Sequence, residues 1–135
     1  SAFVLRDIEI LARFEDIEVG FSIATADETV RKLFEPGAAP VRDRVRALDV
    51  LHARGVRTYA MIAPILPGAE GLIEELAGKV DHVLIDRLNY AYADRVYRHN
   101  RMEWARRDSF FIEKASVLRA GFERRGIPVQ VVFDE

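Results

Sequence analysis

The residues best placed to do chemistry fall where the sequence pattern predicts the carboxyl ends of β-strands. The segment Glu18 to Thr25, EVGFSIAT, alternates a large apolar face with a small face that carries Ser22. The segment Tyr59 to Gly68, YAMIAPILPG, reads as a buried strand that stops at Pro64. A hydroxyl at a strand end can donate to a carboxylate or ribose oxygen, and a proline frees backbone groups from the ladder. Parallel strands ending in this way predict a ligand site at the sheet edge, although Ser22 and Pro64 could equally serve packing and strand termination.

Helical and strand periods alternate along the chain, which is typical of βα units and a parallel sheet. An opening helix is predicted to end near Phe14, and Asp27 is a good N-cap for a short helix. Glycines follow two further helices at Gly55 and Gly126, where helix caps belong. The predicted strands cover 18–25, 56–63, 81–88 and 129–133. Later helices are predicted to start near 40, 71 and 94, and a last helix is marked by Phe111, Ala115, Leu118 and Phe122.

This pattern predicts a single α/β domain over residues 1–135. Right-handed βαβ crossovers leave two architectures open, an open doubly wound sheet or an arc of a (β/α) barrel. The small face formed by Gly20, Ser22 and Ala24 favours the barrel arc, because a lumen that admits a ligand needs small side chains.

Composition excludes several classes of protein. The chain has 50% hydrophobic residues and a formal net charge of −2, so neither disorder nor a globally basic nucleic-acid binder is indicated. No apolar run is long enough for a membrane span and no leader is apparent, so we expect no membrane partner and a cytoplasmic location. The sequence has no cysteine, and His52, His82 and His99 lack the spacing of metal ligands, so no metal site is predicted.

The stretch from Arg87 to Arg107 contains six arginines against only Asp94 and Glu103. Tyr90, Tyr92, Tyr97 and Trp104 are interleaved with them. Arginines can contact phosphates and aromatic rings can stack on bases, so a nucleic-acid contact is one interpretation. The other is an amphipathic helix from Asp94 to Ala105 with solvated arginines.

The middle of the chain resembles radical S-adenosylmethionine (radical SAM) proteins, specifically the spore-photoproduct-lyase-like branch labelled DNA repair photolyase. That branch has a strand ending in S-x-x-T, an L-E-P stretch followed by an arginine, an A-I/L pair before a helix stop, and a strand ending in A-P-I-I-P-G. The corresponding residues are Ser22 and Thr25, Leu33 with Glu35 and Pro36, Arg44, Ala47 with Leu48, Gly55, and Met61 to Gly68. Phe34 interrupts the L-E-P stretch, and Gly37, Pro40 and Val41 replace the usual residues, so the loop before the long helix can differ.

The resemblance implies the second half of a TIM-like partial (β/α)6 barrel. The parent would cleave S-adenosylmethionine reductively to a 5′-deoxyadenosyl radical, using a [4Fe-4S] cluster held by a C-x3-C-x2-C loop. That loop is missing here, and the chain starts at Ser1 within an apolar-periodic stretch. We therefore expect a fragment that is catalytically inactive alone, whose partners are the missing N-terminal half or a second copy bound through the cut face.

By the same resemblance, Ser22 contacts the polar part of S-adenosylmethionine, and the backbone of Ile62, Ala63 and Pro64 supports adenine. Asp86 and Arg87 end the next strand and could reach the same cofactor site, so Arg87 is a further candidate. Neighbouring strand residues point to opposite faces, so at most one of the two faces the lumen. Glu35 and Arg44 are expected to form a surface ion pair that could brace the cofactor side. The alternative function is a non-catalytic α/β binding or interaction module, using the same cleft or touching nucleic acid through Arg87–Arg107.

Overall fold

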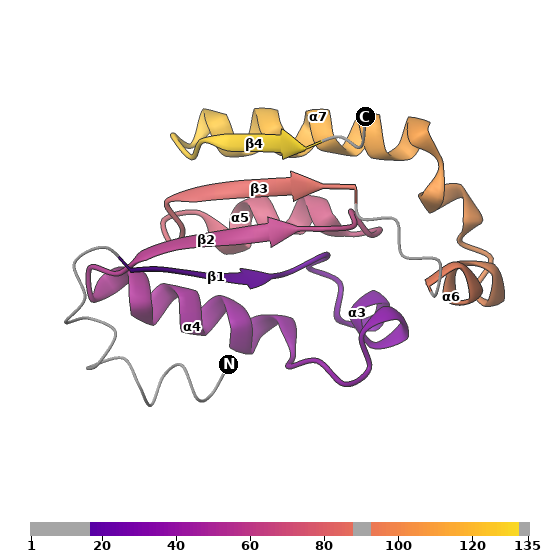
Figure 1. Ribbon diagram of the computed structural model, residues 1–135, viewed down its shortest axis with the longest axis horizontal. Helices are drawn as coiled ribbons and strands as arrows, with labels where there is room; N and C mark the ends of the chain where they lie inside the picture. The colour runs from indigo at the N-terminus through magenta and orange to yellow at the C-terminus, as the bar shows by residue number, and fades with distance from the viewer. Residues whose placement is uncertain (1–16, 88–92, 133–135) are drawn as a thin grey trace.

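A computed structural model describes residues 17–87 and 93–132 as an α/β fold with one four-stranded parallel sheet (Figure 1). The predicted opening helix lies outside the described residues. The elements in chain order are β1 (Glu18–Ser22), α3 (Glu28–Phe34), α4 (Val41–Ala53), β2 (Arg57–Ile62), the 3₁₀ helix η1 (Ala69–Gly71), α5 (Leu72–Leu76), β3 (His82–Asp86), α6 (Asp94–His99), the 3₁₀ helix η3 (Glu103–Arg106), α7 (Asp108–Arg124) and β4 (Val129–Val132).

The strands pair in sequence order, β1-β2-β3-β4, and every pair is parallel. Successive crossovers of the usual right hand then bring α4, α5 and α7 to the same face of the sheet. The core agrees with this arrangement, because Leu48 of α4, Leu72 of α5 and Phe122 of α7 join Ile62 and Ile85 of the sheet in one buried cluster. The predicted alternation of βα units is therefore confirmed.

The opposite face of the sheet, here called the open face, carries different side chains. Strand alternation places Ser22, Tyr59, Met61 and Leu84 on it, and all four keep some solvent exposure, whereas Ile62 on the helix-facing side is fully buried. This contrast means that the helix-facing side forms the hydrophobic core and that, among the described residues, the open face is the less buried side of the sheet.

Gly20 shows how closely the open face is packed near its amino end. Its register partner on β2 is Tyr59, whose ring stacks on His82 of β3 with centroids 5.2 Å apart. A Cβ on Gly20 would lie 2.2 Å from Cζ of Tyr59. The absence of a side chain at Gly20 therefore lets the Tyr59 ring lie across β1.

The helix-rich connection between β1 and β2 is organised by Asp27, Glu28 and Arg31. Asp27 caps α3 as predicted, since its carboxylate accepts hydrogen bonds from Thr29 N and Val30 N. The Glu28 carboxylate reaches the start of α4, where its Oε2 accepts a hydrogen bond from Val41 N at 3.1 Å. The N-cap residue of α4, Pro40, has no side-chain acceptor for this N–H group, so Glu28 takes that role. Its other oxygen pairs with the buried Arg31, which also donates to the carbonyls of Glu35 and Ala38. These bonds fix the loop between α3 and α4.

Two further details differ from the sequence-based expectations. The predicted helix over Asp94–Ala105 is wrong in its continuity, because α6 ends at His99, Arg101 has φ of 55°, and a separate 3₁₀ helix follows. A left-handed residue cannot continue an α-helix. In addition, none of the helices within the described residues is both long and apolar enough to cross a membrane.

We predict that Glu28→Gln weakens folding in a pH-dependent way. The Arg31 hydrogen bond and the Val41 N–H lower the pKa of Glu28 from its ordinary 4.5 to about 2. The ionised carboxylate therefore stabilises the fold above about pH 4.5, and this stabilisation is lost as pH falls from 4.5 through 2. Urea unfolding of the wild type and the variant should differ at pH 7 and converge toward pH 2. The control Glu113→Gln, at an exposed position of α7, should have about the same unfolding free energy as the wild type at pH 7 and at lower pH. An unfolding free energy at pH 7 that Glu28→Gln leaves unchanged would contradict the stabilising role of the Glu28 carboxylate.

Candidate functional site

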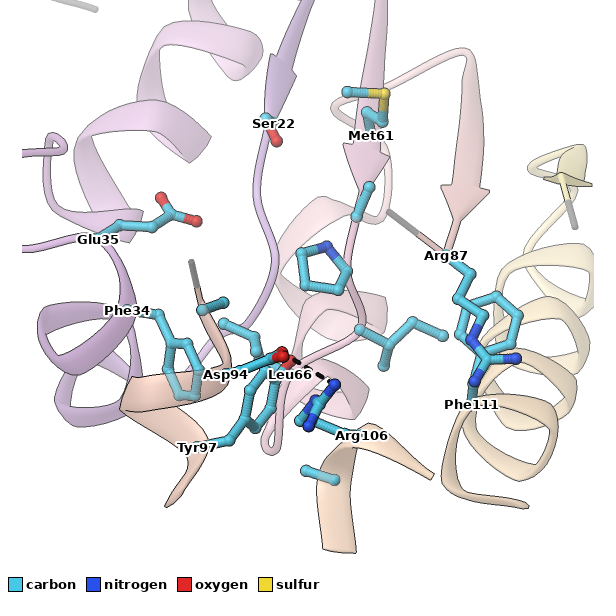
Figure 2. A pocket seen from close by; sticks show the side chains of 15 residues that line it. Ser22, Phe34, Glu35, Met61, Leu66, Arg87, Asp94, Tyr97, Arg106 and Phe111 are labelled. Atoms are coloured by element: carbon cyan, nitrogen blue, oxygen red, sulfur yellow. Dashed lines mark ion pairs between the residues drawn. The ribbon is translucent and has the colours of Figure 1, made fainter. Parts of the chain in front are cut away.

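A pocket of about 320 Å³ lies at the carboxyl edge of the sheet (Figure 2). Its walls come from the ends of β1, β2 and β3, from the loop after α3, and from α6, η3 and α7. The lining residues are Ser22, Phe34, Glu35, Met61, Ala63, Pro64, Ile65, Leu66, Arg87, Ala93, Asp94, Tyr97, Ala105, Arg106 and Phe111. This is the edge at which α/β proteins bind ligands.

The Ala63–Gly68 loop, which forms one wall, is held by the segment that follows β1. Leu66 N donates to Ala24 O at 3.1 Å, and Ala26 N donates to Gly68 O at 3.3 Å. The buried Thr25 hydroxyl donates to Pro67 O at 2.7 Å and accepts from Asp27 N at 3.0 Å. Pro67 and Gly68 are thus bonded to the segment that follows β1, which gives the wall a defined shape.

Arg44 of α4 supports the side of the pocket formed by Ser22 and Glu35. Its guanidinium donates to the Ser22 carbonyl and pairs with Glu35 Oε2 at 3.3 Å. The expected surface ion pair is therefore wrong in one respect, because Arg44 is only 6% exposed. Its Nε and Nη2 are buried without a hydrogen-bond partner among the described residues. Buried donors without a partner are energetically costly.

The floor of the pocket combines aromatic rings with one ion pair. Tyr97 is buried, and the Phe34 ring meets it edge-on with centroids 4.7 Å apart. Arg106 lies with its guanidinium carbon 5.8 Å from the Tyr97 ring centroid and binds Asp94 Oδ1 at 2.9 Å. Burial raises the pKa of Tyr97 to about 12, so its phenol is neutral at physiological pH.

Arg87 closes the pocket on the α7 side. It forms an ion pair with Asp108, and its guanidinium carbon lies 5.7 Å from the Phe111 ring centroid. The preceding residue, Asp86, alternates to the open face together with Leu84 and His82, and its Oδ1 is buried without a partner among the described residues. The strand end therefore directs Asp86 to the open face, while Arg87 reaches the pocket wall.

The structure brings together four of the five residues nominated from sequence. Ser22, Ala63, Pro64 and Arg87 line the pocket, whereas the side chain of Ile62 is fully buried on the helix-facing side, so only its backbone is near. The pocket residues missed from sequence are mainly those of α6 and η3. The sequence feature that marked them was the arginine-rich and tyrosine-rich composition of Arg87–Arg107. This composition did not indicate that α6 and η3 lie at the carboxyl edge of the sheet.

No metal site is evident in the described part of the chain, since no group of three or more histidine, aspartate or glutamate side chains converges there. His52 lies 3.5 Å from Asp81 near the amino ends of the strands, and His82 bonds to Glu18 on the open face at 2.9 Å. These contacts lie toward the amino ends of the strands, so they are separate from the pocket at the carboxyl edge.

Comparisons with known proteins identify relatives without an assigned activity. An uncharacterized protein of Methanocaldococcus jannaschii is 32% identical over 102 residues, covering 73% of this chain and 39% of the relative. An uncharacterized protein of Acidianus two-tailed virus is 31% identical over 68 residues, covering 50% of this chain and 23% of the relative. The chain thus spans well under half the length of these curated relatives. No protein-family profile and no solved structure matches it.

The bonds of Thr25 predict that Thr25→Val destabilises the protein by about 1–3 kcal/mol, because Pro67 O and Asp27 N would each lose a buried partner. Chemical unfolding measures this loss. Thr29→Val is the matched control, since Thr29 is exposed on α3. Equal stability of the two variants would mean that the Thr25 hydroxyl does not hold the loop.

Proposed function

We propose that this chain forms the S-adenosylmethionine-binding edge and substrate mouth of a radical SAM protein of the spore-photoproduct-lyase-like branch. The observation that carries the proposal is the meeting of the Ser22 side chain with Ala63 and Pro64 in one pocket, at the carboxyl edge of adjacent parallel strands. The resemblance nominated these residues for S-adenosylmethionine while they were 41 and 42 positions apart in the sequence.

The sheet geometry supports the architectural part of the proposal, an arc of a TIM-like (β/α)6 partial barrel. Strands in sequence order, with helices on one face, are the arrangement of a (β/α) barrel wall, whereas a doubly wound sheet reverses its strand order. The open face, with Gly20 and Ser22 among its residues, would be the lumen. The outer edge of β1 would pair with the remaining arc or with the corresponding edge of a second copy.

The pocket offers groups suited to each part of S-adenosylmethionine. The Ser22 hydroxyl suits the methionyl carboxylate, and the backbone near Pro64 suits the adenine edge. The Glu35 carboxylate lies on the same side and favours the positive ammonium or sulfonium group.

S-adenosylmethionine supplies a 5′-deoxyadenosyl radical when it is cleaved reductively at a [4Fe-4S] cluster. Such clusters are held by cysteine thiolates, and this sequence has no cysteine. The residues present do not fit the cluster, so the role proposed for this chain is limited to binding and orienting the nucleoside cofactor.

Calorimetric titration of the chain with S-adenosylmethionine tests this function. We expect binding at millimolar ligand or below, weakened about 3- to 10-fold by Ser22→Ala because one neutral hydrogen bond is lost. Ser116→Ala, at an exposed position on α7, serves as the control and should bind as the wild type does. The proposal is contradicted by a folded chain that shows no heat of binding at these concentrations.

A second candidate, a module that contacts nucleic acid, is favoured by the surface of α6 and η3. Arg87 and Arg106 have carboxylate partners, but four exposed arginines lack one among the described residues: Arg95, Arg98, Arg101 and Arg107. Trp104 beside them is 46% exposed, and its ring is held edge-on by Phe110 at 5.4 Å. Unpaired guanidinium groups beside an exposed ring suit a phosphate backbone with stacked bases.

Fluorescence anisotropy with a labelled single-stranded oligonucleotide tests this candidate. Affinity should fall as salt rises, and replacing Arg95, Arg98, Arg101 and Arg107 by glutamine should reduce the slope of log affinity against log salt. Trp104→Ala should cost about 1–3 kcal/mol of binding. The control replaces Arg42 and Arg46, exposed on α4. An equal loss per arginine replaced in the two sets would mean that only net charge matters and would reject a dedicated surface.

A further inference from the structure

We propose that the Asp94 carboxylate recognises the ribose diol of an adenosine group in the pocket, and that Arg106 is the positioning residue for this carboxylate. This inference rests on the proposed function, because both require an adenosyl group at the carboxyl edge of the sheet. It adds the ribose-recognising residue and the selectivity of the site for a nucleoside over a nucleotide.

The walls of the pocket suit a flat, uncharged ring. Phe34 and Tyr97 supply aromatic surface on one side, and Ala63, Pro64 and Leu66 supply apolar surface around it. A volume of about 320 Å³ falls at the small end of ligand pockets, which span roughly 300–1,000 Å³. These surfaces favour a nucleobase by stacking and burial, but they leave its sugar to be recognised by polar groups.

The Asp94 carboxylate is the polar group at the floor of the pocket. Figure 2 shows it directed toward the middle of the cavity from α6, with the Arg106 guanidinium beside it. The Arg106 guanidinium forms an ion pair with Oδ1 of Asp94 at 2.9 Å. No partner for Oδ2 of Asp94 is present among the described residues. An ionised carboxylate is only an acceptor, so it needs donors, and the adjacent hydroxyls of a ribose supply two. A carboxylate that accepts from ribose hydroxyls is the arrangement that dinucleotide-binding folds also use.

The charges around the pocket discriminate against a phosphate. Arg87 pairs with Asp108 and Arg106 pairs with Asp94. Behind the wall, Arg44 pairs with Glu35, which also lines the pocket. Each guanidinium at the site is therefore matched by a carboxylate, and a doubly charged phosphate would find no unmatched cation and would approach two pocket-lining carboxylates. Adenosine should consequently bind at least as well as adenosine 5′-monophosphate.

Titration of the chain with adenosine, 2′-deoxyadenosine, adenosine 5′-monophosphate and S-adenosylmethionine tests the inference. The wild type should prefer adenosine over 2′-deoxyadenosine by about 10-fold and should gain nothing from the phosphate. Asp94→Asn should lower the affinity for adenosine by about 10- to 100-fold and the affinity for 2′-deoxyadenosine much less, so that the preference for the ribose disappears. A purely structural role of Asp94 would weaken both nucleosides equally.

Two further variants separate positioning from folding. Arg106→Gln should keep part of the ribose preference while lowering affinity, since the carboxylate remains but loses its fixed orientation. Asp108→Asn removes an exposed carboxylate at the same rim, which is paired with Arg87, and should leave the preference intact. Thermal unfolding followed by circular dichroism confirms that each variant is folded.

The outcomes distinguish this inference from the proposed function. If S-adenosylmethionine and both nucleosides bind but Asp94→Asn keeps the ribose preference, the inference is overturned and the function stands. If adenosine binds with the expected preference and S-adenosylmethionine does not, the inference is supported and the function is contradicted. If none of the four ligands binds the folded chain, both are overturned.

Discussion

The parallel register of β1 and β2 is the constraint on which the rest of the structure depends. It sets Ser22 opposite Met61, and Ile23 N continues the ladder by donating to Met61 O at 2.9 Å. A shift by one residue would turn Ser22 toward the helices and expose Phe21 and Ile23. The register also brings the Ala63–Gly68 loop alongside the chain that leaves β1, where backbone bonds and the Thr25 hydroxyl hold it. The site wall is thus an extension of the sheet.

Buried arginines perform a second task in the connection between β1 and β2. Arg31 and Arg44 are 5% and 6% exposed, and burying a guanidinium is unfavourable unless its donors are used. Arg31 holds the carbonyls of Glu35 and Ala38, and Arg44 holds the carbonyl of Ser22. Both therefore stabilise backbone that has no strand or helix partner, and one wall of the pocket is built from that backbone.

The one-sided covering of the sheet separates two kinds of surface. The helix-facing side holds the buried apolar clusters, while the open face and the carboxyl edge retain polar and partly exposed groups. The pocket uses the inner sides of α6 and η3, where Tyr97 and Ala105 are buried. The four arginines that lack a carboxylate partner among the described residues occupy exposed positions of the same segment. A small ligand and a polyanion would consequently contact different groups of one structural unit.

The sequence by itself determined the elements and their faces. Alternation in 18–25, short apolar runs and the glycine stops before strands placed all four strands. The N-cap Asp27 started α3, and Gly55 and Gly126 end helices with φ of 84° and 76°. These features follow from local rules of side-chain period and backbone conformation. The family resemblance nominated Ser22, Ala63 and Pro64, and the structure places all three in the pocket at the strand ends.

Only the tertiary structure decided how the remaining pocket residues meet. No local pattern indicates that the Arg44 side chain is buried and donates to the Ser22 carbonyl, 22 positions away. Likewise, no local pattern indicates that α6 and η3 lie at the carboxyl edge of the sheet and place Asp94 and Arg106 in the pocket. A charged side chain reads as solvated from sequence, and whether it is buried depends on partners brought near by the packing of distant segments. The break at Arg101 is similar, because the helical pattern of Asp94–Ala105 is locally acceptable, yet Arg101 has φ of 55° and the following η3 contacts α7.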